Sequence, residues 1–320
     1  MSNFAASYLR YTHHLEQIND GAVNCPQRMI NEVEESYHDH LEGIARTVRR
    51  FHKGARLMMI SGPSSSGKTT TAHLLRDYLT RQGRKAWLLS LDDFYKGAEA
   101  APRLPDGTPD FETVEALEVE AVKACLRDLV STGRAEVPIY DFANSRPSGE
   151  TRRLELEEDD MVVVEGIHAL NPVFTRELPE DSCVKLYVSV KQQIKDANGE
   201  VISPFDLRLV RRIVRDIQFR GTGAEETLAM WDSVVEGEDR YIRPYRHSAD
   251  FTVNTIHIYE PCILRSIAIP LLRAIAEDSL QFRKARDLES RLMRFEPISA
   301  DLVPAHSMIR EFIGTLGLEQ

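Results

Sequence analysis

One stretch of this chain constrains its fold more than any other: Gly62-Pro63-Ser64-Ser65-Ser66-Gly67-Lys68-Thr69. It satisfies the P-loop pattern GxxxxGK[ST] and directly follows an apolar run at residues 57–60. Residues 70–79 have the apolar spacing of a helix. Strand, glycine-rich turn and helix therefore occur in the order that this motif requires.

The chemistry of the motif depends on that order. The glycines let backbone N–H groups surround the β- and γ-phosphates of a nucleotide, Lys68 adds a cation, and the Thr69 hydroxyl can bind Mg²⁺. We therefore predict ATP and Mg²⁺ as cofactors. The predicted ATP-binding residues of this stretch are Gly62, Pro63, Ser64, Ser65, Ser66, Gly67, Lys68, Thr69 and Thr70.

Length and composition exclude several classes. The 320 residues suffice for one large α/β domain with an appendage. A net charge of -10 argues against nonspecific binding to nucleic acid or to an anionic membrane. No apolar run approaches the roughly 20 residues of a membrane span, and no signal-peptide core is visible, so a cytoplasmic protein is expected. The cysteines are far apart and are expected to be reduced: Cys25, Cys125, Cys183 and Cys262.

From residue 56 onward, apolar strands alternate with helices, which predicts an α/β fold with a parallel sheet covered by helices on both faces. Ligands bind beyond the carboxyl ends of the strands in such sheets. A small antiparallel insertion is expected over about residues 134–157. The predicted strands are 57–61, 86–91, 161–165, 184–190 and 250–254, and the predicted helices are 67–81, 113–131, 207–218, 224–236 and 260–276.

Residues 1–52 show helical spacing without a strand signal, so we predict a helical extension there and a P-loop domain over 53–320. His13, His14, His38 and His40 are expected on solvated helix faces, because adjacent helical residues point in different directions and do not build a metal site.

Two acidic motifs follow predicted strands. Asp92 and Asp93 come after the second strand, where one carboxylate could accept a proton from an acceptor hydroxyl as an ordinary ionised Asp, although a capped turn would also explain the pair. Glu165 ends the third strand and could hold Mg²⁺, with a turn acid as the alternative. His168 fits a packed histidine in the next turn.

Five arginines lie within residues 206–222, and Arg208, Arg212 and Arg215 share one helix face. Such a face suits a lid, over about 204–223, that closes on phosphates and offsets developing charge. A solvated charged face is the alternative.

The order of these motifs, with Tyr140-Asp141-Phe142 between them, resembles the uridine kinase and phosphoribulokinase group of P-loop kinases over about residues 55–275. It is most similar to bacterial uridine kinase-like nucleoside kinases that carry a threonyl-tRNA-synthetase-like N-terminal region, most of which is missing here. The resemblance implies a nucleoside-kinase-like P-loop fold.

Carried over by position, the resemblance implies roles for further residues. Asp92, Lys68 and Arg220 would be catalytic, Arg215 and Asp250 would contact ATP, and Thr69, Glu165 and Asp93 would hold the metal. The acceptor pocket would comprise Asp92, Tyr95, Glu112, Tyr140, Arg212 and Met230.

The departures from the family pattern concern the acceptor. Ala143-Asn144-Ser145-Arg146 lacks the expected His, Thr222 replaces an Arg, and Met230-Trp231 stands where a base-contacting Gln is expected. Losing one hydrogen-bonding partner for the base would cost about 1–3 kcal/mol of discrimination.

Three functions follow from these patterns. The first is phosphoryl transfer from ATP to the 5′-hydroxyl of uridine or cytidine; the second is the same chemistry on a sugar phosphate or polyol; the third is an ATP-dependent switch without kinase activity. A small-molecule substrate is the expected partner, with no nucleic acid and no membrane. Because related kinases are often oligomeric, a homo-oligomer stays open.

Overall fold

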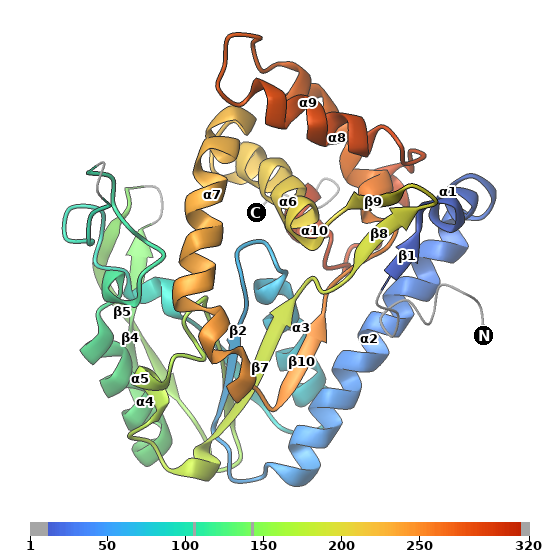
Figure 1. Ribbon diagram of the computed structural model, residues 1–320. Coiled ribbons are helices and arrows are strands. Elements are labelled where there is room, and N and C mark those ends of the chain that lie inside the picture. The colour runs from blue at the N-terminus through green and yellow to red at the C-terminus, as the bar shows by residue number, and fades with distance from the viewer. Residues whose placement is uncertain (1–11, 105–106, 142–143, 315–320) are drawn as a thin grey trace.

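The computed structural model describes residues 12–104, 107–141 and 144–314. Five parallel strands form the central sheet in the order β10-β7-β2-β6-β3 (Figure 1). Each agrees with a predicted strand to within one residue at either end. Their bounds are β2 Leu57–Ser61, β3 Ala86–Ser90, β6 Met161–Glu165, β7 Cys183–Ser189 and β10 Phe251–Asn254.

Both faces of this sheet are covered by helices, which confirms the predicted fold class. Met58 and Ile60 of β2 pack into the core on one face, and Leu57 and Met59 pack into the core on the other. This alternation is what a strand buried on both sides requires. The first face carries α2 (Pro26–Phe51), α3 (Lys68–Arg81) and α8 (Glu260–Arg273), and the second carries α4 (Val119–Thr132) and α5 (Pro172–Thr175).

The helix predicted over 113–131 begins later than expected, at Val119. Thr113 accepts a hydrogen bond from the Glu115 amide and opens a short 3₁₀ turn, Val114–Ala116. Leu117 then pairs with Tyr95 in an antiparallel bridge. These tertiary contacts hold residues 113–118 beside the site and delay the helix.

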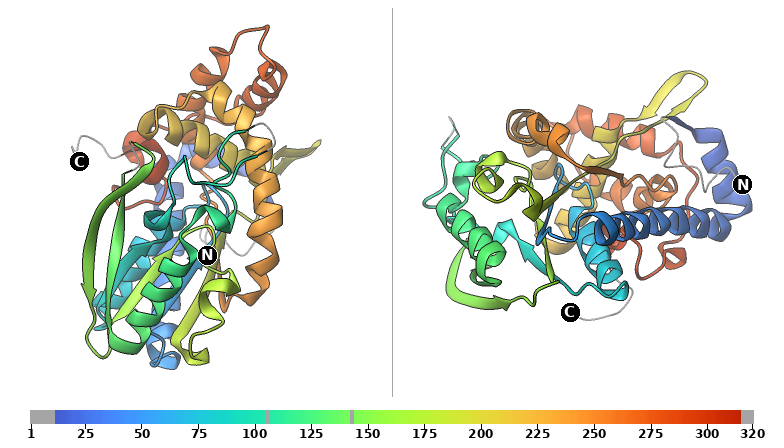
Figure 2. Two further views of the ribbon diagram at one scale, coloured as in Figure 1. Left: turned by 90° about the vertical axis from the view of Figure 1, so that its left-hand side faces the viewer. Right: turned by 90° about the horizontal axis from the view of Figure 1, so that it is seen from below.

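The predicted insertion is an antiparallel hairpin of β4 (Arg134–Asp141) and β5 (Arg146–Glu155). It stands beside α4 (Figure 2) and packs against it through β4. Phe142 and Ala143 of the tip lie outside the described residues. Of residues 143–146, where the family pattern has a His, only Asn144, Ser145 and Arg146 are described, and all three are exposed.

The N-terminal extension is helical in α1 (Leu15–Asn24) and α2, as predicted, but its first described residues form a strand. β1 (Thr12–His14) pairs in parallel with β8 (Gln193–Asp196), which forms a hairpin with β9 (Gly199–Ile202). The sequence analysis predicts none of these three strands, because each is shorter than the alternating pattern needed to recognise it.

The histidine prediction is wrong for two residues. His13 lies on β1 and is 5% exposed. The ring of His38 is half-buried and its Nδ1 lies 2.7 Å from the Tyr78 hydroxyl of α3. His40 is exposed on α2, as expected, and His14 is exposed but lies on β1 and not on a helix.

Helix α6 (Pro204–Phe219) lies above the carboxyl ends of the strands, and α7 (Ala224–Tyr241) packs against it and runs down beside the sheet (Figure 1). The chain ends in α9 (Phe282–Leu292) and α10 (Arg310–Ile313), a region for which the sequence analysis predicts no element. Over the described ranges, no helix is long and apolar enough to cross a bilayer. All four cysteines are free thiols, as expected.

Candidate active site

The P-loop follows β2 directly and its conformation explains its glycines. A Cβ on Gly62 would lie 2.0 Å from the Val188 carbonyl oxygen of β7, so no other residue fits there. Ser65 and Gly67 have φ angles of 56° and 85°, in the left-handed region. The loop therefore combines a close backbone approach with a sharp reversal into α3.

Side chains from outside the loop hold its carbonyl oxygens. Arg208 donates to Ser64 O at 3.0 Å, Arg211 to Ser65 O at 3.2 Å, and the Thr255 hydroxyl to Ser66 O at 2.7 Å. Within the described part of the chain, the hydroxyl oxygens of Ser65 and Ser66 are buried without a hydrogen-bond partner. Buried polar atoms left open in this way fit a ligand rich in oxygen atoms, such as a phosphate chain.

Lys68 begins α3 and donates to Pro63 O at 3.0 Å. Burial lowers the pKa of Lys68, and the negative charges of Glu165 and Asp92 oppose that shift. These three charged residues come from the ends of β2, β6 and β3, as expected for the carboxyl edge of the sheet.

Asp92 and Glu165 share one neighbour, Ser90. The Ser90 hydroxyl donates to Glu165 Oε1 at 2.8 Å and accepts from the Asp92 amide at 3.3 Å. Burial raises the pKa of Asp92, although Lys68 and Arg220 oppose the shift. Burial and the Asp92 charge together raise the pKa of Glu165 to about 7. The pKa of Asp92 is therefore higher than that of an ordinary aspartate, in contrast to the expectation of an unshifted pKa, because desolvation outweighs its cationic neighbours.

The oxygen donors beside Lys68 fit Mg²⁺, which prefers carboxylate and hydroxyl ligands. The Thr69 side chain is exposed at the start of α3, and the Glu165 carboxylate has only the Ser90 hydroxyl as a hydrogen-bond partner among the described residues. Asp93 does not join them, which corrects its assignment as a metal ligand: its Oδ2 lies 3.7 Å from Arg152 Nη2 of the insertion hairpin.

Three of the predicted arginines surround one buried carboxylate, Asp216. Arg215 donates to Asp216 Oδ1 at 2.8 and 2.6 Å, Arg212 Nε lies 3.2 Å from Oδ2, and Arg220 Nε lies 3.7 Å from Oδ1. The charges of Arg220 and Arg215 both act to lower the pKa of Asp92. This end of α6 thus places surplus positive charge next to the acids of the site.

Arg208 is buried against Glu238, so the prediction that it lies on a phosphate-binding face of a lid is wrong. Its guanidinium is 3% exposed and bonds both carboxylate oxygens of Glu238. Arg211 is fully buried and bonds Glu260 at 2.6 and 2.7 Å. These two arginines are neutralised by carboxylates and act as supports of the P-loop.

The predicted acceptor residues gather next to Asp92. The Tyr95 ring meets the Tyr140 ring edge-on with centroids 6.1 Å apart, and its hydroxyl donates to Phe111 O at 3.2 Å. Burial raises the pKa of Glu112 to about 7, while Arg212 acts to lower it. His168 is 1% exposed, and burial lowers the pKa of His168 to about 4, as expected for a packed histidine.

Helix α7 meets this group at Gly237, where a Cβ would lie 2.6 Å from Glu112 Cβ. Met230 is seven residues earlier on the same helix face, about 10 Å further along, and is 37% exposed. Its assignment to the acceptor pocket stays a prediction. Trp231 is buried, and the Cζ atom of Arg208 lies 5.4 Å from the centroid of its ring, so Trp231 belongs to the core.

Asp250 is not at the nucleotide site, which corrects its assignment to ATP. It precedes β10 at the opposite end from the P-loop, and its carboxylate accepts from the Lys185 amide at 2.8 Å. It lines a separate cleft of about 350 Å³ with Arg176 and Cys183.

The sequence analysis misses Asp216, Ser90 and Thr255. Asp216 had a detectable signal, since it stands four residues from both Arg212 and Arg220 on one helix. Ser90 and Thr255 had none, because both act through contacts between strands and loops.

A P-loop after the first sheet strand, acids at the ends of two neighbouring strands and an arginine-bearing helix above them define a P-loop phosphotransferase. The chain belongs to the Phosphoribulokinase / Uridine kinase family, whose model matches residues 57–259, more than half of the chain. This membership supports an ATP-dependent kinase acting on a small molecule.

Curated relatives agree with this membership. The chain is 31% identical over 195 residues to a uridine kinase of Staphylococcus haemolyticus, covering 61% of this chain and 84% of that protein. It is 32% identical over 196 residues to a uridine kinase of Macrococcus caseolyticus, covering 61% and 85%. A solved structure of a possible uridine kinase from Bacillus stearothermophilus is 20% identical with a TM-score of 0.45, covering 68% of this chain and 98% of that one.

Proposed function

We propose that this protein transfers the γ-phosphoryl group of ATP, with Mg²⁺, to the 5′-hydroxyl of a pyrimidine nucleoside. The observation that carries the proposal is the convergence of Lys68, Asp92 and Glu165 below an arginine cluster at the end of the P-loop strand. Phosphoryl transfer needs a cation on the transferred group, a carboxylate at the acceptor and added positive charge, and all three are present.

Each residue has a part in that proposal. The P-loop amides and Lys68 would bind the β- and γ-phosphates, with Thr70 and Arg215 beside them. Asp92 would orient the acceptor hydroxyl and take its proton, and Arg220 would offset charge on the phosphoryl oxygens. Thr69 and Glu165 would hold Mg²⁺, which neutralises phosphate charge when bound.

The acceptor would lie between Asp92 and Glu112, with Tyr95, Tyr140 and Arg212 around it. The uridine kinase relatives support a nucleoside with a free ribose 5′-hydroxyl. The two carboxylates could also bind the ribose diol.

A second candidate, phosphorylation of a sugar phosphate or polyol, has one observation in its favour. Trp231 is withdrawn into the core and Met230 offers no hydrogen bond, so neither residue at this position of α7 can read the edge of a base. A polyol acceptor would not need such a reader.

The test begins with ADP release by the purified protein with ATP and Mg²⁺ across nucleosides, ribose phosphates and polyols, and mass spectrometry of each product. A nucleoside monophosphate would support the first candidate. Turnover confined to a sugar or polyol would support the second, and no product on any acceptor would contradict both.

Asp92→Asn then tests the base. We expect turnover to fall by about 10²–10⁴-fold, since a positioned carboxylate contributes that much, with ATP affinity little changed. Asp93→Asn is the matched control, because Asp93 faces Arg152, and should keep activity. Full turnover by Asp92→Asn would remove Asp92 from this role.

A further inference from the structure

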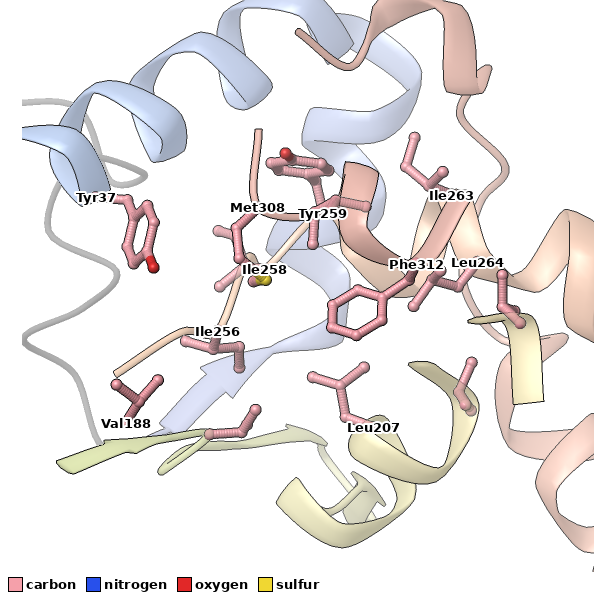
Figure 3. Packing of buried hydrophobic residues seen from close by; sticks show 14 of the residues in the cluster. Tyr37, Val188, Leu207, Ile256, Ile258, Tyr259, Ile263, Leu264, Met308 and Phe312 are labelled. Carbon is pink, nitrogen blue, oxygen red and sulfur yellow. The ribbon is translucent and has the colours of Figure 1, made fainter. Parts of the chain in front are cut away.

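The chain returns to its P-loop in its last described residues. This C-terminal segment, residues 304–314, packs between α2, α6 and the loop after β10 (Figure 3). Ser307 donates to Glu34 of α2 at 2.5 Å, and Met308 and Phe312 are fully buried. Figure 3 shows Met308 beside Ile258 and Phe312 facing Leu207 of α6.

Glu311 of this segment binds Thr70, a residue assigned above to ATP. Its Oε2 accepts from the Thr70 amide at 3.1 Å and from the Thr70 hydroxyl at 2.7 Å. Thr70 lies in the first turn of α3, whose N-cap, Gly67, has no side chain to satisfy the free amides. A carboxylate therefore occupies the kind of position where helix N-termini bind phosphate oxygens.

Two neighbours of Glu311, Met308 and Phe312, also contact the P-loop or an arginine that supports it. Met308 lies over Gly67, where a Cβ would be 2.7 Å from the Met308 sulfur. The Phe312 ring packs beneath the Arg211 guanidinium, 5.1 Å from ring centroid to Cζ. The anionic Glu311 thus lies against the first turn of α3, while the buried Phe312 ring holds the segment against Arg211 of α6.

We propose that the C-terminal segment occupies part of the nucleotide site of the free protein, with the Glu311 carboxylate in place of an α-phosphate oxygen, and competes with ATP. The proposal rests on ATP binding at the P-loop, as proposed above. Glu311 cannot stay on Thr70 while a phosphate oxygen binds the same amide and hydroxyl. The segment must move before a nucleotide is fully bound.

The competition has a measurable size. When only a fraction of molecules is open, the apparent Kd equals the intrinsic Kd divided by that fraction. The two hydrogen bonds that Thr70 donates to the charged Glu311 carboxylate stabilise the closed arrangement. We expect Glu311→Ala to bind ATP about tenfold more tightly, a difference of about 1.4 kcal/mol.

The experiment is calorimetric titration of the full chain with Mg²⁺-ATP and no acceptor, for wild type, Glu311→Ala, Glu311→Gln and Glu277→Gln. Glu277 is an exposed glutamate between α8 and α9, so its variant controls for the loss of one negative charge. Hydrogen exchange of residues 304–314 is followed with and without ATP, and circular dichroism reports folding of each variant.

We expect Glu311→Ala to bind ATP more tightly than wild type, Glu311→Gln to show a smaller gain, and Glu277→Gln to show no change. We also expect the amides of the segment to exchange faster when ATP is present. If wild type binds ATP and folded Glu311→Ala binds it equally or more weakly, Glu311 is only a cap of α3 and the inference is overturned while the proposed function stands. If no variant binds ATP, both fail. If Glu311→Ala does not fold, unchanged exchange of the segment in ATP-bound wild type overturns the inference.

Discussion

The two ends of α6 use arginine in opposite ways. In the first half, Arg208 and Arg211 each have a carboxylate of their own, Glu238 and Glu260, and both pairs are buried. At the other end, Arg212, Arg215 and Arg220 share the single carboxylate of Asp216.

The charge balance of each group explains its use. A guanidinium and its paired carboxylate have no net charge together, and the remaining guanidinium donors of Arg208 and Arg211 hold P-loop carbonyls. Three guanidinium groups around one carboxylate leave two positive charges in surplus beside Asp92, where a transferred phosphoryl group would need them. The number of carboxylates per arginine thus distinguishes the arginines that support the P-loop from those available to a substrate.

The largest expected effect comes from the surplus end. Arg220→Ala should lower kcat by about 10³-fold, as loss of an arginine from a phosphoryl-transfer site does. Its side chain is 56% exposed, so the free energy of unfolding should change by no more than about 0.5 kcal/mol. Turnover on the accepted substrate and urea unfolding measure both quantities. An unchanged kcat would place Arg220 outside the chemistry.

The neutralised end should show the reverse pattern. Glu260→Gln leaves the Arg211 charge buried without its partner, so the free energy of unfolding should fall by about 3–5 kcal/mol in urea. Glu236→Gln, which breaks the exposed pair with Arg240 on α7, is the control and should show no measurable change. Equal stability of the two variants would contradict the distinction drawn between the ends of α6.

The pH dependence gives the smallest effect. Because the pKa of Glu165 is about 7, protonation should reduce kcat/KM as the pH falls below 7. Protonation of Asp92 should also reduce kcat/KM, and because Arg220 acts to lower the pKa of Asp92, this second limb should move to higher pH in Arg220→Ala and stay in place in Arg220→Lys. A pH profile of kcat/KM for the three proteins checks this, and coincident profiles would show that Arg220 does not act on the acids.

The free energy of unfolding should change with pH in the direction opposite to that of kcat/KM. The folded protein keeps the Glu165 proton up to a pKa of about 7, against 4.5 for an ordinary glutamate. This contribution is therefore fully present below 4.5 and is lost as the pH rises through 7. Above pH 7, where Glu165 is ionised and could bind Mg²⁺, the folded protein lacks this contribution to its free energy of unfolding.

The central sheet was predictable because each of its strands is a short apolar run followed by a recognisable turn or acid. β1, β8 and β9 were not, since each has only three or four residues. β1 in addition pairs with a segment about 180 residues later, as the neighbouring contact between His13 and Gln192 illustrates, whereas β8 and β9 form a local hairpin. The late start of α4 likewise depends on the Tyr95–Leu117 bridge and not on helix propensity.

The site divides in the same way. Lys68 was predictable from the P-loop motif, and Asp92 and Glu165 from their places at strand ends. The roles of Arg208 and Arg211 were not, because their carboxylates lie 30 and 49 residues away and helix spacing shows only which arginines share a face. Asp93 and Asp250 were misassigned because a motif position does not tell which way a carboxylate points.

The hydrogen bond between Glu34 and Ser307 has a consequence for how the chain is made. Its two residues are 273 positions apart, so at about 5–20 residues per second the ribosome needs roughly 15–55 s between them. During that time the part of α2 around Glu34 and His38 lacks its contacts with Ser307 and His306. Helix α2 therefore completes its packing only after a segment made more than 250 residues later has left the ribosome.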